Sequence, residues 1–177
     1  FYDEVRLSTY TQDIDTSNMV NGKPIYYSIS QRDLLVDSSD IGYLALVNCT
    51  NIHIKNVTLT NNGQGLLLAF TTNSTIENAT ITDNRVGIHV LSSDENTITA
   101  NNLTNNNSGV SLYRSSLNNI TKNTITNNGI SIGILIMGGG TLLTTKSIPS
   151  EDNIISSNAM SNVGIGLTNP GTTRTII

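Results

Sequence analysis

The sequence predicts an all-β protein, a right-handed, single-stranded parallel β-helix with about 22 residues and three short strands in each coil. The first observation is a strict repeat: aliphatic residues recur every 22 positions between residues 51 and 136, and fixed periods of this kind are typical of solenoids. The second is that these residues occur singly or as i, i+2 pairs, which is the periodicity of strands. The third is composition, because 25 of the 177 residues are Asn, which suits tight turns.

Four columns of aliphatic residues define the inner face of the repeat. They are Ile54, Ile76, Ile98 and Ile120; Leu59, Ile81, Leu103 and Ile125; Leu66, Ile88, Val110 and Ile132; and Leu68, Val90, Leu112 and Ile134. Coils of a parallel β-helix stack about 4.8 Å apart, so residues 22 apart become vertical neighbours. We therefore expect an outward ladder of Thr60, Thr82, Thr104 and Thr126, and a turn ladder of Asn62, Asn84, Asn106 and Asn128. Lys55 and Glu77 are expected to form an exposed ion pair.

One run of the repeat, residues 73–88, reads Asn-Ser-Thr-Ile-Glu-Asn-Ala-Thr-Ile-Thr-Asp-Asn-Arg-Val-Gly-Ile. It resembles the parallel β-helix repeats of the NosD-like family, which are grouped with carbohydrate-binding and sugar-hydrolase β-helix domains. The stretches 14–27 and 42–50 resemble repeat-bearing surface proteins of methanogenic archaea. The resemblance implies an extracellular segment of a longer surface or S-layer protein, close to envelope glycans. It carries no catalytic motif, so it assigns no catalytic residue.

The chain divides into two regions. Residues 1–24 do not match the repeat and are expected to cap the lower end of the solenoid or to be the remnant of a preceding region. Residues 25–177 are expected to form the β-helix, for which the length of the chain predicts seven or eight coils. The register breaks after Ile136 and resumes at Ile155, so an inserted loop is predicted at about 137–152. Exposed ends of the solenoid would permit self-association.

Composition narrows the classes of partner. Charged residues make up 12% of the chain, the net charge is −4, and no basic run is present, which argues against nucleic acid. The stretch richest in apolar residues, 130–137, is far shorter than the ~20 residues that a membrane-spanning helix needs. Cys49 is the single cysteine, so no internal disulfide framework exists.

The sequence contains no cluster of residues typical of a catalytic site or a metal site. The carboxylates occupy different positions within the repeat, whereas general acid–base chemistry needs paired groups. His53 and His89 also lie at unrelated positions in the repeat, which does not favour a copper site. No catalytic residue, metal ligand or cofactor is therefore assigned. A polysaccharide lyase or hydrolase stays open as the alternative to a non-catalytic module.

A sugar-binding patch is the leading candidate site. Phe70 and Arg114 share one position of the repeat two coils apart, Tyr113 precedes Arg114, Asp94 lies near the same corner, and His89 lies on the adjoining outer face. Aromatic and planar polar side chains on one face favour carbohydrate. The sequence thus predicts a non-catalytic extracellular module, a rigid spacer or adhesin that binds glycans.

Two further features concern the outer surface. A Thr-x-Thr pattern (Thr58/Thr60, Thr80/Thr82, Thr124/Thr126) would form a hydroxyl array like those of ice-binding solenoids, although Thr is also an ordinary outward strand residue. Asn-x-Ser/Thr sequons make Asn78 and Asn102 candidate glycosylation sites in a secreted protein.

Overall fold

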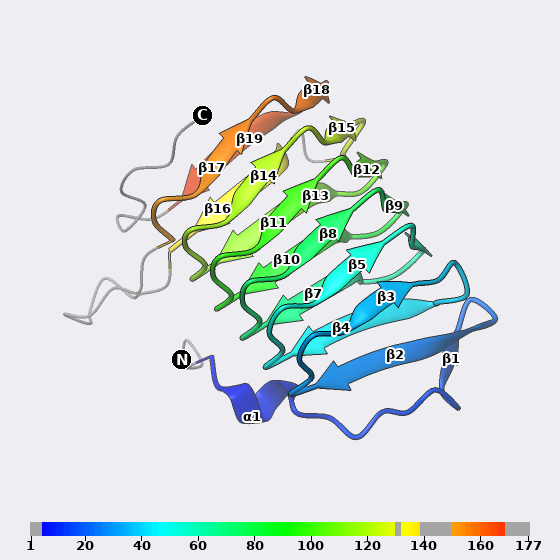
Figure 1. Cartoon of the computed structure of the whole chain (residues 1–177). Coiled ribbons are helices and arrows are strands. Elements are labelled where there is room, and N and C mark those ends of the chain that lie inside the picture. The colour runs from blue at the N-terminus through cyan, green and yellow to red at the C-terminus, as the bar shows by residue number, and fades with distance from the viewer. Residues whose placement is uncertain (1–4, 130–131, 139–149, 169–177) are drawn as a thin grey trace.

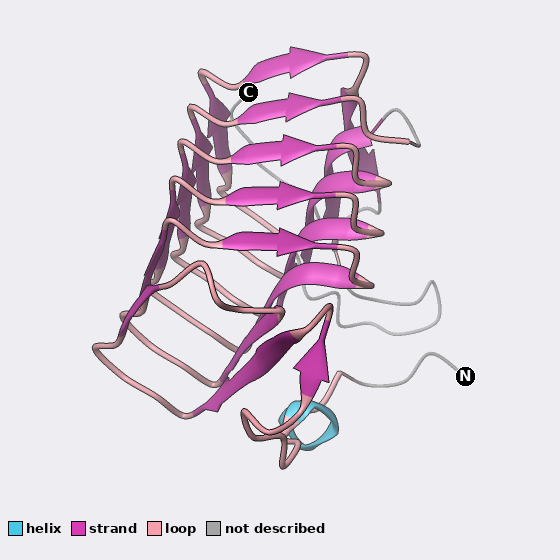
Figure 2. Cartoon of the chain, turned by 90° about the vertical axis from the view of Figure 1, so that its right-hand side faces the viewer, coloured by secondary structure: helices cyan, strands magenta, loops and turns pink. Residues whose placement is uncertain are grey.

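The structure is a computed structural model that describes residues 5–129, 132–138 and 150–168, and it shows a three-sided parallel β-helix (Figure 1). Each full coil contributes one strand to each of three sheets, of eight, six and five strands. Figure 2 shows the coils stacked one above another with their strands aligned. Strands of successive coils pair in parallel, whereas β1 and β2 pair antiparallel. The predicted fold class is confirmed.

From β4 onward, successive strands along the chain belong to the three sheets in turn. The eight-stranded sheet contains β1 (Met19–Val20), β2 (Lys23–Ile29), β4 (Tyr43–Val47), β7 (Gln64–Ala69), β10 (Val86–Leu91), β13 (Ser108–Tyr113), β16 (Ile132–Met137) and β19 (Gly164–Thr168). The six-stranded sheet contains β3 (Leu35–Asp37), β5 (His53–Lys55), β8 (Thr75–Glu77), β11 (Thr97–Thr99), β14 (Asn119–Thr121) and β17 (Ile154–Ser156). The five-stranded sheet contains β6 (Thr58–Thr60), β9 (Thr80–Thr82), β12 (Asn102–Thr104), β15 (Thr124–Thr126) and β18 (Ala159–Ser161).

Stacked aliphatic columns fill the interior. Leu66, Ile88 and Val110 pair in register, as do Leu68 and Val90, and all five are fully buried. Each such side chain contributes roughly 1.5–3 kcal/mol relative to exposure. Because neighbouring strands present the same repeat position, the core continues from coil to coil without a gap in the pattern.

The fourth copy departs from the predicted register at β16. Val110 pairs with Ile134, not Ile132, and Leu112 pairs with Ile136. The turn before β16 is longer: Val110 lies four positions after Asn106, whereas Ile134 lies six positions after Asn128, the residue that stacks on Asn106. A slip of two residues keeps the same side chains facing inward, because strands alternate with period two.

The number of coils is smaller than the length of the chain predicts. Among the described residues, five coils place a strand in all three sheets, since the five-stranded sheet runs from β6 to β18. Residues 5–22 lie outside the coils, and β17 resumes 17 positions after β16 ends at Met137. Residues 139–149, most of the predicted insertion, lie outside the described residues. The predicted resumption is confirmed, because Ile120 pairs with Ile155.

Buried polar ladders line the corners of the coils. In the predicted turn ladder, the backbone N–H of Asn62 donates to Asn84 Oδ1, and that of Asn84 donates to Asn106 Oδ1. The side-chain amide of Asn84 donates in turn to the carbonyls of Leu59 and Thr82. Three further ladders repeat this arrangement: Ser74, Asn96, Asn118 and Asn153; Ala79, Asn101, Asn123 and Asn158; and Cys49, Thr71, Ser93, Ser115 and Ser150.

The Asn richness therefore has two causes. At the corner of the predicted turn ladder, the residue before each ladder amide takes left-handed backbone angles, as at Asn61 (φ 59°) and Asn105 (φ 58°). The ladder amides Asn84, Asn106 and Asn128 are buried and satisfy backbone groups that the turn leaves without a ladder partner. The second role depends on a short side chain that carries a donor and an acceptor.

The N-terminal segment lies against the first coils. Helix α1 (Leu7–Tyr10) precedes β1, which adds an antiparallel strand to the edge of β2. The turn after β1 contacts a neighbouring sheet, because the side-chain amide of Asn21 donates to the carbonyl of Thr60 at 2.8 Å. Within the described ranges, no helix has the length and hydrophobicity that crossing a bilayer requires.

Candidate functional site

A groove of about 520 Å³ runs across the outer face of the eight-stranded sheet. It spans strands β7, β10, β13 and β16 and the turns that precede the first three of them. Its lining residues are Gly63, Gln64, Arg85, Val86, His89, Asn107, Ser108, Ser111, Leu135 and Met137. Amide, hydroxyl, imidazole and guanidinium groups thus face one hollow that also has an apolar side.

The strand register places His89 at the centre of an outward column. Leu67, His89, Ser111 and Leu135 are consecutive partners on β7, β10, β13 and β16. Burial lowers the pKa of His89 below its ordinary value of 6.5. The ring is therefore neutral at pH 7, and one of its nitrogens carries a lone pair that accepts a proton or a hydrogen bond.

Arg85 supplies the positive charge of the groove. It is exposed in the turn before β10, where its backbone N–H donates to the Asn62 carbonyl. No carboxylate is among the described residues that line the groove. The electrostatics therefore favour a neutral or anionic ligand over a cation.

The 22-residue repeat brings the lining residues of the groove together, because residues 22 positions apart lie side by side in successive coils. Gly63, Arg85 and Asn107 lie 22 positions apart in the turns, and Gln64, Val86 and Ser108 follow them. The prediction from sequence named His89 but missed Arg85, Asn107 and Ser111. The signal that points to them is the repeat itself: Ser111 occupies the repeat position of His89 one coil later, and Arg85 and Asn107 share the turn position four residues earlier.

The structure distributes the predicted sugar-binding residues over three environments. His89 lines the groove, and Tyr113 is the register partner of Met137 at its edge. Phe70 instead packs against Tyr10, with ring centroids 6.2 Å apart and planes tilted by 60°. The N-terminal segment therefore contacts the ring that was predicted to face a sugar.

The two remaining members of the predicted patch, Arg114 and Asp94, have partners outside the groove lining. The Arg114 guanidinium carbon lies 5.2 Å from the centroid of the Tyr113 ring, and the buried Arg114 Nε has no hydrogen-bond partner. The Asp94 carboxylate accepts a 2.7 Å hydrogen bond from the backbone N–H of Ser116 in the next coil. Asp94 thus links two coils at a corner and is not among the residues that line the groove.

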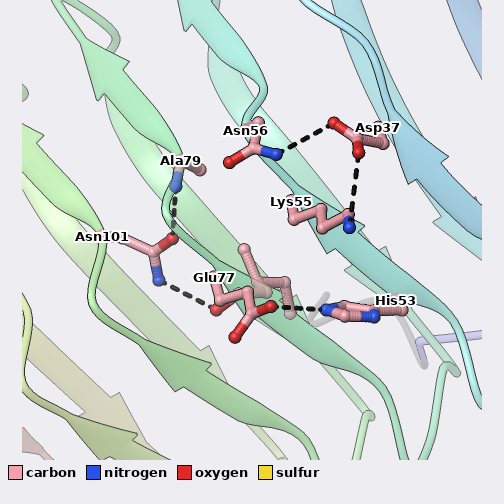
Figure 3. A network of polar contacts seen from close by, with 8 residues as sticks. Asp37, His53, Lys55, Asn56, Glu77, Ala79 and Asn101 are labelled. Carbon is pink, nitrogen blue, oxygen red and sulfur yellow. Dashed lines mark hydrogen bonds and ion pairs between the residues drawn. The ribbon is translucent and has the colours of Figure 1, made fainter.

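A second polar cluster lies on the six-stranded sheet (Figure 3). His53 Nε2 lies 2.8 Å from Glu77 Oε1, and Lys55 Nζ lies 3.4 Å from Asp37 Oδ2. The side-chain amide of Asn56 also donates to Asp37. The predicted Lys55–Glu77 pair is therefore replaced by two other pairs, although the two residues are register partners. Exposed pairs of this kind contribute little, typically ~0–1 kcal/mol.

The other reactive residues are separated from the groove. Cys49 is buried, and burial raises the pKa of its thiol. His53 and His89 belong to different sheets. In the part of the chain that the structure describes, no three His, Cys, Asp or Glu residues are placed to hold a metal ion. Asn78 and Asn102, the candidate glycosylation sites, are both exposed, whereas the sequon residue Asn106 is buried.

Solved structures of similar fold include an alginate lyase and polysaccharide epimerases. The chain superposes on an alginate lyase from Paenibacillus sp. str. FPU-7 with a TM-score of 0.59 and 18% identity, over 80% of this chain and 54% of that one. The Azotobacter vinelandii mannuronan C-5 epimerase AlgE6 A-module superposes with a TM-score of 0.50 and 16% identity, over 81% of this chain and 49% of that one. The periplasmic alginate epimerase AlgG superposes with a TM-score of 0.54 and 14% identity, over 84% of this chain and 46% of that one. At these identities the similarity shows the fold alone, and this chain spans about half the length of those structures.

None of the curated proteins matches the chain by sequence. The match to a family is broad, because residues 33–176 fit the family described as the right-handed β-helix region. That range covers all three sheets from β3 onward, including every strand that lines the groove. The chain therefore belongs to the right-handed β-helix family.

Proposed function

We propose that this chain is part of a polysaccharide-active protein whose groove binds an acidic sugar chain and removes a proton from it. The observation that carries the proposal is the neutral imidazole of His89 in a groove that also contains the Arg85 cation. A neutral imidazole is a competent general base near pH 7. A guanidinium is suited to a sugar carboxylate, which it binds with charge-assisted hydrogen bonds.

The chemistry follows from the groups in the groove. Proton abstraction next to a carboxylate places negative charge on that carboxylate, and Arg85 with the amides of Gln64 and Asn107 would stabilise it. If the bond from the next carbon to the glycosidic oxygen then breaks, a carbon–carbon double bond forms and the released oxygen takes a proton. If the bond survives and a proton returns to the opposite face, the sugar is epimerised. The names of the similar structures, a lyase and two epimerases, support this shared first step.

Hydrolysis is less well supported by the same groove. Hydrolysis of a glycosidic bond ordinarily uses two carboxyl groups on opposite sides of the bond. The described lining residues include no Asp or Glu. The lyase or epimerase form of the enzyme is therefore favoured over the hydrolase form.

The test is an assay of the protein on alginate, polygalacturonate and a neutral glucan. Elimination is followed by the ultraviolet absorbance of the new double bond, and epimerisation by deuterium uptake from D₂O into the polymer. His89→Gln should lower the rate by about 10²–10⁴-fold, the usual contribution of a general base. Arg85→Ala should weaken binding of the acidic polymers roughly tenfold, which corresponds to one charge-assisted contact.

Matched control variants lie outside the groove. His53→Gln removes the imidazole on the six-stranded sheet, and Lys122→Ala removes an exposed cation at the corner between β14 and β15. Both should retain the activity and the affinity of the wild type. Equal losses in a control and its groove variant would contradict the assignment. Because burial lowers the pKa of His89, activity should persist below pH 6.5 before protonation removes the base.

The second candidate is a non-catalytic module, a rigid spacer or adhesin at the cell surface that binds glycans through the same groove. The continuous corner ladders favour it, since they stiffen the solenoid over its described length. The resemblance to NosD-like repeats and to surface proteins of methanogenic archaea supports an extracellular location. Binding that requires Arg85, without unsaturated product or deuterium uptake, would establish this role in place of the enzyme.

A further inference from the structure

The outer face of the eight-stranded sheet has two halves. One half holds the groove, and the other is an apolar cluster that lies under the N-terminal segment. The buried members of that cluster are Ala45, Val47, Leu67, Ala69 and Leu91, and the partly buried residues packed against them are Val5, Leu7, Tyr10, Tyr27, Ile29, Tyr43, Phe70 and Tyr113. Figure 1 shows α1 beside the lower coils, near β2.

The covered half is continuous with the groove. Leu67, which is 5% exposed, is the register partner of His89. Leu91 is the partner of Tyr113, and Tyr113 is the partner of the groove residue Met137. His89 is therefore a direct strand neighbour of Leu67, a member of the apolar cluster.

The covered half has the composition of a sugar-binding surface. Phe70, Tyr27 and Tyr113 each interact with Tyr10, and Tyr43 packs against the same apolar cluster; each of these rings has an apolar face. The pKa of Tyr10 is raised by burial and further by Tyr113, in agreement with the closeness of the two phenols. Sugar rings stack on aromatic faces of this kind, because both present flat apolar surface with polar edges.

The segment that covers these rings makes shallow contacts. None of the residues of α1 is buried. The contacts across the boundary include the hydrogen bond from Tyr27 Oη to the Tyr10 carbonyl at 2.5 Å and the ring contact between Tyr10 and Phe70. Segments with few buried residues open at low free-energy cost compared with the unfolding of a domain.

We propose that residues 5–18 are a displaceable cover over an aromatic subsite that continues the groove, and that long glycan chains displace it while short ones do not. The inference rests on the proposed function, because the groove supplies the first part of the binding site. A chain long enough to reach Tyr113 and Phe70 competes with Tyr10 and Leu7 for the same surface. Binding then shifts the population of the segment toward its open state.

The test compares short and long oligosaccharides of the polymer that the groove binds. Leu7→Ala with Tyr10→Ala weakens the cover, and it should tighten binding of the long oligosaccharide by roughly three- to tenfold while leaving the short one unchanged. Ser8→Ala with Thr9→Ala alters exposed positions of the same helix and should change neither affinity. Adding Tyr113→Ala to the weakened cover should abolish the gain, since it removes one of the rings.

Hydrogen exchange of residues 5–18 in the wild type gives a second readout. The long oligosaccharide should increase exchange there, and the short one should not. If the short oligosaccharide binds but the weakened cover gains nothing for the long one, the cover is purely structural and this inference is wrong. If neither length binds in a way that needs Arg85, the proposed function fails, and the role of the cover fails with it.

Discussion

At the scale of single residues, the stability of this protein depends on buried amides as much as on aliphatic side chains. Asn101 is 2% exposed, and its side chain accepts from the backbone N–H of Ala79 (Figure 3) and donates to the carbonyl of Ile76 and to Asn123. Each corner turn directs backbone groups inward that no strand pairs. An amide in the ladder satisfies one donor and one acceptor at once.

Replacing one ladder amide should therefore cost much more than replacing an exposed neighbour. In Asn101→Ala the N–H of Ala79 and the carbonyl of Ile76 lose their partners, and we expect a loss of about 2–4 kcal/mol in the free energy of unfolding. Asn102→Ala, one position later on the exposed side of β12, should change it by less than about 0.5 kcal/mol. Urea unfolding measures both, and similar values for the two variants would contradict the argument.

At the scale of elements, backbone approach between coils constrains the strands of the eight-stranded sheet. A Cβ added at Gly87 would lie 2.5 Å from the carbonyl oxygen of Gly109, which is too close for any rotamer to relieve. Gly87→Ala should force the two strands apart and destabilise the protein by about 1–3 kcal/mol. Gly63→Ala is the control, since nothing lies within 4 Å of its added Cβ. Thermal unfolding that does not distinguish the two would show that the sheet yields without cost.

Elements also show how far the sequence alone determines the fold. Columns such as Ile54, Ile76 and Ile98 are unambiguous because each coil offers one aliphatic residue at that position. Strand β16 is ambiguous, since Ile132, Ile134 and Ile136 alternate and satisfy two registers equally well. The sequence pattern cannot choose between them, because the choice depends on the length of the turn before the strand.

The candidate site was predictable only in part for a related reason. The outward position of His89 could be predicted, because alternation along a strand fixes the direction of each side chain. Whether an outward residue is accessible to solvent also depends on segments that are distant in the sequence. Phe70 contacts Tyr10, which lies 60 positions earlier in the sequence, and no repeat pattern predicts that contact.

At the scale of the whole molecule, the N-terminal segment and the coils share a row of phenols. Burial, with a further effect of Tyr27, raises the pKa of Tyr43 from 10.0 to about 12. Burial likewise raises the pKa of Tyr27, with a further effect of Tyr10. The row runs from the first coils of the eight-stranded sheet to the segment that covers them, so its ionisation affects both parts together.

Alkaline pH should therefore weaken the folded state. Between pH 10 and about 12 the unfolded chain has released the Tyr43 proton while the folded chain retains it, so the folded state binds more protons and stability falls as pH rises. The contribution is fully present below pH 10 and is lost through the folded pKa. Tyr43→Phe should flatten this decline in Tm, whereas Tyr26→Phe, which alters an exposed ring on β2, should not. Parallel profiles of Tm against pH for the wild type and Tyr43→Phe would show that the loss of stability arises elsewhere.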